Sequence, residues 1–282
     1  MLYKFSGAGN DFVVMDGRRA DVSAFRHATR IGELCREYGT DGLMILGEAP
    51  GVDFEMEFYN PDGSGGMMCG NGGRCIVAFA DYLGIRPADG ELYSFLAPDG
   101  LHRASILEGP ACSHSGAPAG ERGSGEVAGD MRWTVRLQMI DVKECVPARG
   151  GWFLNTGTRH LVLLVDDIEA VDMESTAKPL RWDAEFQPEG TNVNFVQLAP
   201  DGLHVRTFEK GVEGETLACG TGLTAAAIAV WKTGGSGTPS PRTDGRIAYR
   251  LQCRRGDWLS VDFLPDLSSV HLTGPAELVS IG

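Results

Sequence analysis

The sequence predicts an α/β protein built from two similar halves, and three observations lead to this prediction. A Cys-Gly-polar-Gly turn begins at Cys69 and again at Cys219, and each turn precedes an apolar helix. Residues 109–130, near the middle of the chain, are Gly, Ser, Ala or Pro at 15 of 22 positions, which is typical of a linker. The predicted helix 223–231 is apolar on every face, so a sheet wrapped around it would bury it.

The first half alternates between strand and helix patterns. Residues 24–38 carry apolar side chains at helical spacing and end at Gly39, and residues 75–83 place apolar side chains on one helical face. Apolar and polar residues alternate over 54–59, which indicates a half-buried strand. The predicted strands are 12–15, 43–46 and 54–59, with further strands up to Leu107.

The second half repeats this pattern after the linker. Strand-like runs lead to a glycine-rich turn and then to the apolar helix, as in the first half. A loop rich in glycine and other small residues, 233–246, joins that helix to one more strand. The predicted strands are 131–140, 161–165, 193–198, 205–208 and 247–253.

The composition excludes several functional classes. The 282 residues include 25 basic and 38 acidic side chains, a net charge of −13, so the basic surface that nucleic acids and anionic membranes require is absent. No run approaches the roughly 18–20 apolar residues of a membrane span, and the first residues lack the pattern of a secretory signal. We therefore expect a cytoplasmic protein with reduced cysteines. The seven cysteines form no Cys-x-x-Cys pair, so no metal site is predicted.

The paired turns predict two reactive thiols. A cysteine at a helix N-terminus lies at the positive end of the helix dipole, which stabilises the thiolate. The glycines of the two turns let a ligand approach the backbone, and the N–H groups of a helix N-terminus bind a carboxylate. The structural alternative is that both cysteines are simply buried at tight turns.

Two opposed cysteines suit the inversion of a carbon centre. One thiolate removes the proton from the Cα of an amino acid, and a thiol on the other side delivers a proton to the opposite face. The carbanion needs stabilisation, which two helix N-termini directed at the carboxylate would supply. This chemistry requires neither pyridoxal phosphate nor a metal, so no cofactor is predicted, and the expected partner is a small amino acid.

Several segments resemble diaminopimelate epimerases, which interconvert LL- and meso-diaminopimelate without a cofactor, and the resemblance covers nearly the whole chain. Proline racemases and a phenazine-biosynthesis isomerase are similar in fold and belong to the wider superfamily. The matching segments are 7–14 (GAGNDFVV), 60–64 (NPDGS), 68–75 (MCGNGGRC), His160 with 165–167 (VDD), 191–196 (TNVNFV), 209–211 (EKG) and 214–222 (GETLACGTG).

The resemblance implies two pseudo-symmetric domains, each a mixed sheet or barrel curled around a central helix, with the active site in the cleft between them. The implied domains are 1–118 with 268–282, which carries Cys69, and 119–267, which carries Cys219. These two cysteines match the acid/base pair of the family, and His160 and Glu209 match residues that tune the cysteines. The implied substrate-binding residues are Asn10, Asn60, Gly70, Asn71, Asn192, Glu209, Lys210, Gly220 and Thr221.

Three positions depart from the family pattern. Thr158 stands where asparagine is common, Lys210 where arginine is usual, and Gly42 where glutamine is often found. Lysine can still pair with a carboxylate but lacks the two-pronged guanidinium group. A different amino-acid substrate, such as proline or hydroxyproline, is therefore an alternative, and a thiol redox-switch protein is a more distant one. The sequence leaves the oligomeric state open, a homodimer included.

Some of these side chains also have structural interpretations. The alternative for His160 is a buried structural histidine, and the alternative for Glu209 is a solvated charge at a strand end. Asp62 is expected to stabilise its turn. Cys35 and Cys75 are expected to pack in helix cores.

Overall fold

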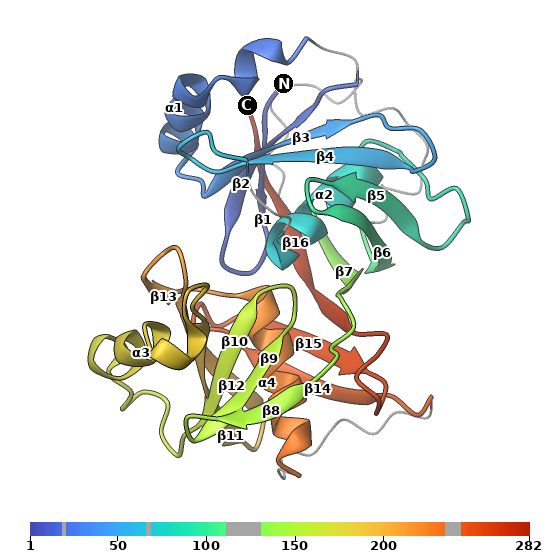
Figure 1. Cartoon of the computed structure of the whole chain (residues 1–282). Helices are drawn as coiled ribbons and strands as arrows, with labels where there is room; N and C mark the ends of the chain where they lie inside the picture. The colour runs from blue at the N-terminus through green and yellow to red at the C-terminus, as the bar shows by residue number, and fades with distance from the viewer. Residues whose placement is uncertain (19–20, 66–68, 111–130, 235–243) are drawn as a thin grey trace. The chain divides into compact units, whose positions relative to one another are not determined.

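The computed structural model describes residues 1–18, 21–65, 69–110, 131–234 and 244–282, and the chain divides into two compact units (Figure 1). The first half comprises Met1–Leu137 and Gly274–Gly282, and the second half comprises Gln138–Thr273. The boundary expected at residues 118–119 lies outside the described residues. Each half is a mixed sheet around one central helix, which confirms the predicted fold class.

Eight strands close into a barrel in the first half. Their order is β1-β2-β3-β4-β5-β6-β7-β16, and β16 also pairs with β1. The sheet is mixed because β2–β3 and β4–β5 are parallel while β1–β2 and β3–β4 are antiparallel. The strands are β1 (Tyr3–Ser6), β2 (Asp11–Asp16), β3 (Gly42–Gly47), β4 (Phe54–Tyr59), β5 (Tyr93–Ala97), β6 (Gly100–Glu108), β7 (Arg132–Gln138) and β16 (His271–Ile281).

The central residues of strands β2 and β3 are apolar because both faces of these strands are covered. Helix α1 (Ala28–Tyr38) packs on one face, where its Ile31 joins Val13 and Ile45 in a buried cluster, and α2 contacts the same two strands. The predicted helix 24–38 is wrong at its start. A separate 3₁₀ turn spans Ser23–Arg26, and the extended backbone of His27 divides it from α1.

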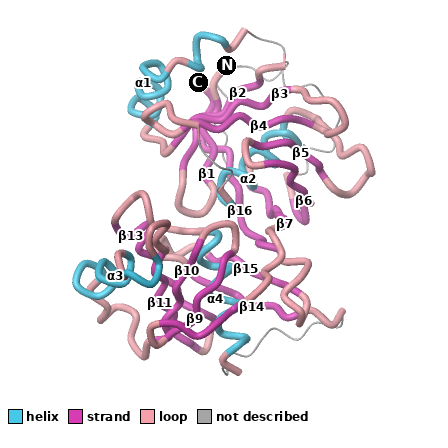
Figure 2. Tube along the Cα trace, viewed as in Figure 1, coloured by secondary structure: helices cyan, strands magenta, loops and turns pink. Residues whose placement is uncertain are grey.

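The central helix of the first half, α2 (Gly70–Tyr82), is buried along its whole length and contacts β1, β2, β3 and β6 (Figures 1 and 2). Its apolar pattern predicts a helix only from residue 75, because the first turn contains glycines, which are poor helix formers. These glycines belong to the helix because close packing compensates for their low propensity. The apolar pattern alone therefore places the start of the helix five residues too late.

The second half has the same plan around α4 (Gly220–Lys232), which contacts β8, β9, β10, β11, β12, β14 and β15. The sheet order is β8-β9-β10-β11-β12-β14-β15-β16, and β13 pairs with β12. Helix α3 (Met173–Arg181) contacts β11 and β12, and a 3₁₀ turn, η4, spans Ala184–Phe186. The strands are β8 (Cys145–Ala148), β9 (Gly151–Asn155), β10 (Arg159–Leu164), β11 (Asn192–Ala199), β12 (Gly202–Glu209), β13 (Gly214–Thr216), β14 (Ile247–Gln252) and β15 (Trp258–Phe263).

The strand registers of the two halves can be compared position by position. In the first half Leu43 of β3 pairs with Tyr59 of β4, and in the second half Val193 of β11 pairs with Phe208 of β12. One residue further along each chain, Asn60 and Glu209 therefore occupy equivalent places. Asn60 directly follows β4, and Glu209 is the last residue of β12. Among the helices of the described segments, none has the length and apolar character needed to cross a membrane.

Candidate active site

Cys69 is the N-cap residue of α2 in the first half. Its carbonyl accepts the hydrogen bond of the Gly73 N–H at 2.8 Å, and its Sγ accepts that of the Gly72 N–H at 3.2 Å. A Cβ atom at position 72 would lie 3.3 Å from this sulfur, so glycine allows the close approach. The N–H donor and the positive end of the helix dipole both favour a negative charge on this sulfur.

Asn10 and Asn60 lie in turns of the first half. Asn10 Oδ1 accepts a hydrogen bond of 2.7 Å from the side chain of Asn71, the second residue of α2. Asn60 follows β4 and donates to Ser64 Oγ at 3.0 Å. Asp62 accepts from the N–H of Ser64 at 2.9 Å, so its contacts are those of a turn residue.

Cys219 is the N-cap residue of α4 and is 7% exposed. Its Sγ lies 3.4 Å from Thr221 Oγ1. A Cβ atom at Gly222 would lie 2.5 Å from Asn194 Oδ1, so only glycine permits α4 to approach β11 this closely. Cys69 and Cys219 therefore hold equivalent positions, each within its own half, at the start of a buried central helix.

Glu209, the last residue of β12, contacts Cys219. Thr216 Oγ1 donates to Glu209 Oε2 at 2.9 Å, and the Cys219 thiol also hydrogen-bonds the carboxylate. Burial raises the pKa of Glu209 above its ordinary value, and these two hydrogen bonds oppose that rise. Glu209 is therefore not a solvated charge at a strand end.

His160 lies in β10 and is completely buried. Its Nδ1 lies 3.0 Å from Asn194 Nδ2, and the oxygen of the same amide accepts a hydrogen bond of 2.9 Å from Thr207. The pKa of His160 is lowered to about 3, chiefly by burial; the Asn194 hydrogen bond opposes this shift and the positive charge of Lys210 adds to it. His160 is therefore uncharged at neutral pH.

Asn192 bridges the two loops that carry Thr158 and Lys210. Its Nδ2 donates to Arg159 O at 2.9 Å and to Thr158 Oγ1 at 3.4 Å. Its Oδ1 accepts from the Lys210 N–H at 2.8 Å. The Lys210 ammonium donates to Glu189 O at 3.2 Å in an exposed contact. The structure thus brings together the two positions that depart from the family pattern in this half.

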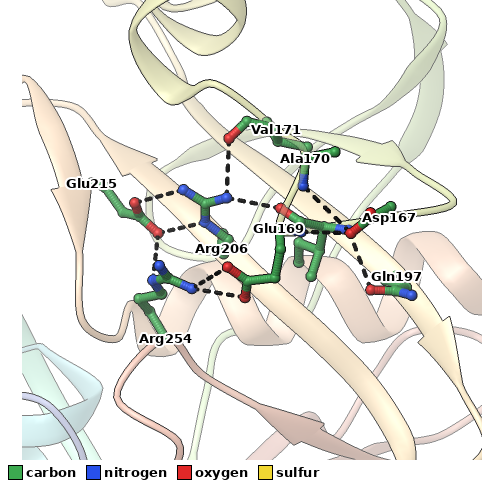
Figure 3. A network of polar contacts seen from close by, with 9 residues as sticks. Asp167, Glu169, Ala170, Val171, Gln197, Arg206, Glu215 and Arg254 are labelled. Carbon is green, nitrogen blue, oxygen red and sulfur yellow. Dashed lines mark hydrogen bonds and ion pairs between the residues drawn. The ribbon is translucent and has the colours of Figure 1, made fainter.

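Arg206 holds β13 against β12 through a polar network (Figure 3). Its Nε and Nη2 atoms donate to Glu215 at 2.7 and 2.8 Å. Its Nη1 donates to Ile168 O at 2.8 Å and to Val171 O at 3.0 Å. The guanidinium group, which is largely buried, is thus paired with a carboxylate and two backbone carbonyls.

Arg254 extends this network by joining Glu215 to the exposed carboxylate of Glu169 (Figure 3). Glu215 is followed directly by Thr216, whose hydroxyl holds Glu209. The network therefore fixes the short strand from which the Glu209 contact is made.

Some side chains in this arrangement received no role from the sequence. Asn194, Thr207 and Thr216 hold His160 and Glu209. The sequence does contain a pattern that could have indicated Asn194. Asn192 and Asn194 are alternate residues of a mostly apolar strand, so both side chains face the same side of the sheet. Thr216 gives no pattern of its own. Within the described ranges, no group of three His, Cys, Asp or Glu side chains is arranged to hold a metal ion.

Solved structures show that this fold is that of a group of isomerases and related biosynthetic proteins. A phenazine biosynthesis protein of Bacillus anthracis matches 99% of the chain and 96% of its own with a TM-score of 0.65 and 10% identity. A hydroxyproline epimerase of Agrobacterium vitis matches 100% of the chain and 89% of its own with a TM-score of 0.57 and 14% identity. At these identities the likeness establishes the fold.

The sequence comparisons are more specific. A family model described as diaminopimelate epimerase matches residues 2–90 and 152–243. Diaminopimelate epimerases of Chlorobaculum tepidum and Flavobacterium psychrophilum are each 37% identical; the alignments cover 98% and 99% of this chain and 98% and 97% of those proteins. The chain belongs to the diaminopimelate epimerase family, which is a family of isomerases.

Proposed function

We propose that this protein interconverts LL- and meso-diaminopimelate by moving a proton from one face of an α-carbon to the other. The observation that supports this most strongly is the equivalent placement of Cys69 and Cys219. Each caps the buried central helix of its half, and each is followed by a Gly-polar-Gly turn. Membership of the family supplies the substrate class.

The proposed reaction has two proton transfers. One cysteine, as a thiolate, takes the proton from Cα; the C–H bond breaks, its electron pair stays on the substrate, and an S–H bond forms. The other cysteine, as a thiol, gives its proton to the opposite face of that carbon. The two cysteines exchange protonation states in each turnover, so the reverse reaction starts from the opposite state. The scheme requires both sulfurs to reach one carbon, and it uses no metal or pyridoxal phosphate.

The developing charge is stabilised by backbone donors. As Cα loses its proton, negative charge spreads into the α-carboxylate, which then gains from N–H groups aimed at it. The first-turn N–H groups of a helix have no acceptor within the helix. Gly70 and Asn71 in the first half, and Gly220 and Thr221 in the second, are the residues assigned to this role.

Glu209 and His160 are assigned to setting the state of the thiols. A carboxylate that accepts a hydrogen bond from the Cys219 thiol stabilises the protonated form of that sulfur. The thiol can then give its proton to the substrate carbanion. His160 is neutral and buried, so it adds no positive charge to the site and can act only as a neutral hydrogen-bonding group.

Asn10, Asn60, Asn192 and Lys210 are the side chains assigned to binding the substrate. Lys210 is the cation suited to the distal carboxylate, which would replace the Glu189 carbonyl as its partner. Thr158 supplies a hydroxyl where the family commonly has an amide. A substrate without a distal carboxylate would make no use of Lys210.

The direct test is incubation with LL-diaminopimelate in heavy water. We expect meso-diaminopimelate to form and deuterium to enter at Cα. If neither occurs while proline or hydroxyproline is racemised, the substrate assignment is wrong but the two-cysteine chemistry survives. If no amino acid exchanges its α-proton and the thiols only cycle between oxidised and reduced forms, the proposal fails as a whole.

A further inference from the structure

We propose that Arg74 is a positioning residue that fixes the amide of Asn10, so that Asn10 presents an N–H group to the substrate carboxylate. The inference rests on the proposed function, in which Asn10 binds the substrate. It concerns a chain of four side chains in the first half, Arg74, Asn71, Asn10 and Asp41.

Arg74 is a fully buried cation in the first turns of α2. Its guanidinium group donates to Pro275 O at 3.2 Å, to Gly70 O at 3.1 Å and to Gly7 O at 3.1 Å. A fourth bond, from Nη2 to Asn71 Oδ1, is 2.9 Å long. These partners hold the planar group in one orientation, which a lysine ammonium could not reproduce.

The direction of the hydrogen bonds follows from the chemistry of the two ends. A guanidinium group can only donate, so Asn71 must turn its oxygen toward Arg74. The Asn71 amide nitrogen then faces Asn10 and donates to Asn10 Oδ1 at 2.7 Å. Asn10 Nδ2 in turn donates to Asp41 Oδ2 at 3.2 Å, and a carboxylate can only accept. The donor Arg74 at one end and the acceptor Asp41 at the other therefore require the same orientation of the Asn71 and Asn10 amides.

This orientation matters for an anionic ligand. Asn10 Nδ2 carries two hydrogens, and Asp41 takes one of them. The second hydrogen is left for a carboxylate. In the flipped orientation Asn10 would present its oxygen instead, which would repel the anion.

Close packing keeps the four side chains within hydrogen-bond reach of one another. A Cβ atom at Gly7 would lie 2.8 Å from Asn71 O and 2.8 Å from Cys75 Sγ, so only glycine lets the turn before Asn10 lie against α2. Asp41 is tied to the same place, because its carboxylate also accepts from the Asp11 N–H at 2.9 Å.

The sharpest test is Asn71→Asp, which keeps the size of the side chain and reverses the bond to Asn10. A carboxylate at position 71 can still accept from Arg74 but cannot donate to Asn10, so Asn10 must flip. We expect KM for diaminopimelate to rise about tenfold or more, with a smaller fall in kcat. Gln138→Glu makes the same amide-to-acid change at an exposed position and should leave both constants unchanged.

Asp41→Asn and Arg74→Lys complete the series. With asparagine at position 41, its oxygen can still accept from Asn10 and Arg74 still sets the direction, so KM should rise less than in Asn71→Asp. Arg74→Lys keeps the charge but loses the planar guanidinium group and its fixed set of donors. KM should therefore rise even in a protein that melts close to the wild-type temperature. An unchanged KM in folded Asn71→Asp or Arg74→Lys, or a larger effect for Asp41→Asn than for Asn71→Asp, overturns the proposal.

A measurement without turnover separates this inference from the proposed function. In ¹⁵N-labelled protein, the side-chain amide signals of Asn10, assigned by their loss in Asn10→Ala, should shift strongly in Asn71→Asp and stay in place in Gln138→Glu. Signals that do not move in Asn71→Asp contradict the amide relay, whichever amino acid the enzyme acts on.

Discussion

The side-chain amide of Asn194 donates a 3.0 Å hydrogen bond to Nδ1 of His160, and this contact fixes which ring nitrogen of the histidine carries the proton. The same amide nitrogen donates to Leu161 O at 3.1 Å, and a carbonyl can only accept, so the nitrogen must face this side. His160 Nδ1 is therefore the acceptor, and its proton is on Nε2. Within the described residues Nε2 has no hydrogen-bond partner, which leaves a buried N–H donor in the candidate site.

The buried neutral histidine predicts a loss of stability in acid. An unfolded histidine binds a proton near pH 6.5, whereas folded His160 does so only near pH 3, so the unfolded state holds more protons in between. The associated stability is fully present above about pH 6.5 and is lost progressively as the pH falls toward 3. His160→Gln should flatten this dependence by up to about 1.4 kcal/mol per pH unit, measured by urea unfolding from pH 7 to 5. The exposed His27→Gln should retain the wild-type slope, and equal slopes in both variants would contradict the assignment.

Thr216→Val should change the pH dependence of turnover. Loss of the Thr216 hydrogen bond removes one of the two interactions that oppose the raised pKa of Glu209. The pKa of Glu209 should then rise further, and the acidic limb of the kcat/KM profile should move to higher pH. Thr216→Ser, which keeps the hydroxyl, should restore the wild-type profile. A profile that is the same in Thr216→Val as in wild type would show that this contact does not set the state of Glu209.

Gly42→Ala should destabilise the first half. A Cβ atom at position 42 would lie 2.8 Å from Tyr59 O and 2.9 Å from Phe58 Cε2, so the Phe58 ring fills the space that a side chain here would need. We expect unfolding to become easier by about 1–3 kcal/mol, measured in urea. Gly47→Ala at the other end of β3 meets nothing closer than 3.8 Å and serves as the matched control. Equal effects of the two variants would contradict the claim that the Phe58 ring occupies the space beside Gly42.

Glu215→Gln should lower the stability of the second half. Arg206 is largely buried, and removal of the charge on its partner leaves the guanidinium group poorly compensated (Figure 3). We expect a loss of about 1–3 kcal/mol in the free energy of unfolding. Glu169→Gln changes an exposed member of the same network and should cost less than about 0.5 kcal/mol. A loss in Glu169→Gln as large as that in Glu215→Gln would show that burial does not govern this network.

The sequence predicted the features that depend on chain order and periodicity. The repeat of the Cys-Gly-polar-Gly turn located both central helices, and alternation located β4. The helix starts were less predictable, because the glycines in the first turn of α2 hide the apolar pattern, and a local turn at Ser23–Arg26 continues the spacing of α1.

The supporting contacts were beyond sequence reasoning because they depend on the pairing of distant strands. Asn194 meets His160 only because β10 and β11 are parallel in a register that sets His160 opposite Asn192. Thr216 meets Glu209 only because β13 folds back on β12. No local pattern in the chain specifies either register.

The central claim is that Cys69 and Cys219 form the acid/base pair, and the most direct measurement is the turnover of LL-diaminopimelate by the single variants Cys69→Ala and Cys219→Ala. Cys35→Ala in α1 and Cys145→Ala in β8 are the matched controls. The account predicts that each of the first two variants loses at least about a hundredfold in rate, while both controls keep wild-type turnover. A wild-type rate in either Cys69→Ala or Cys219→Ala would contradict it.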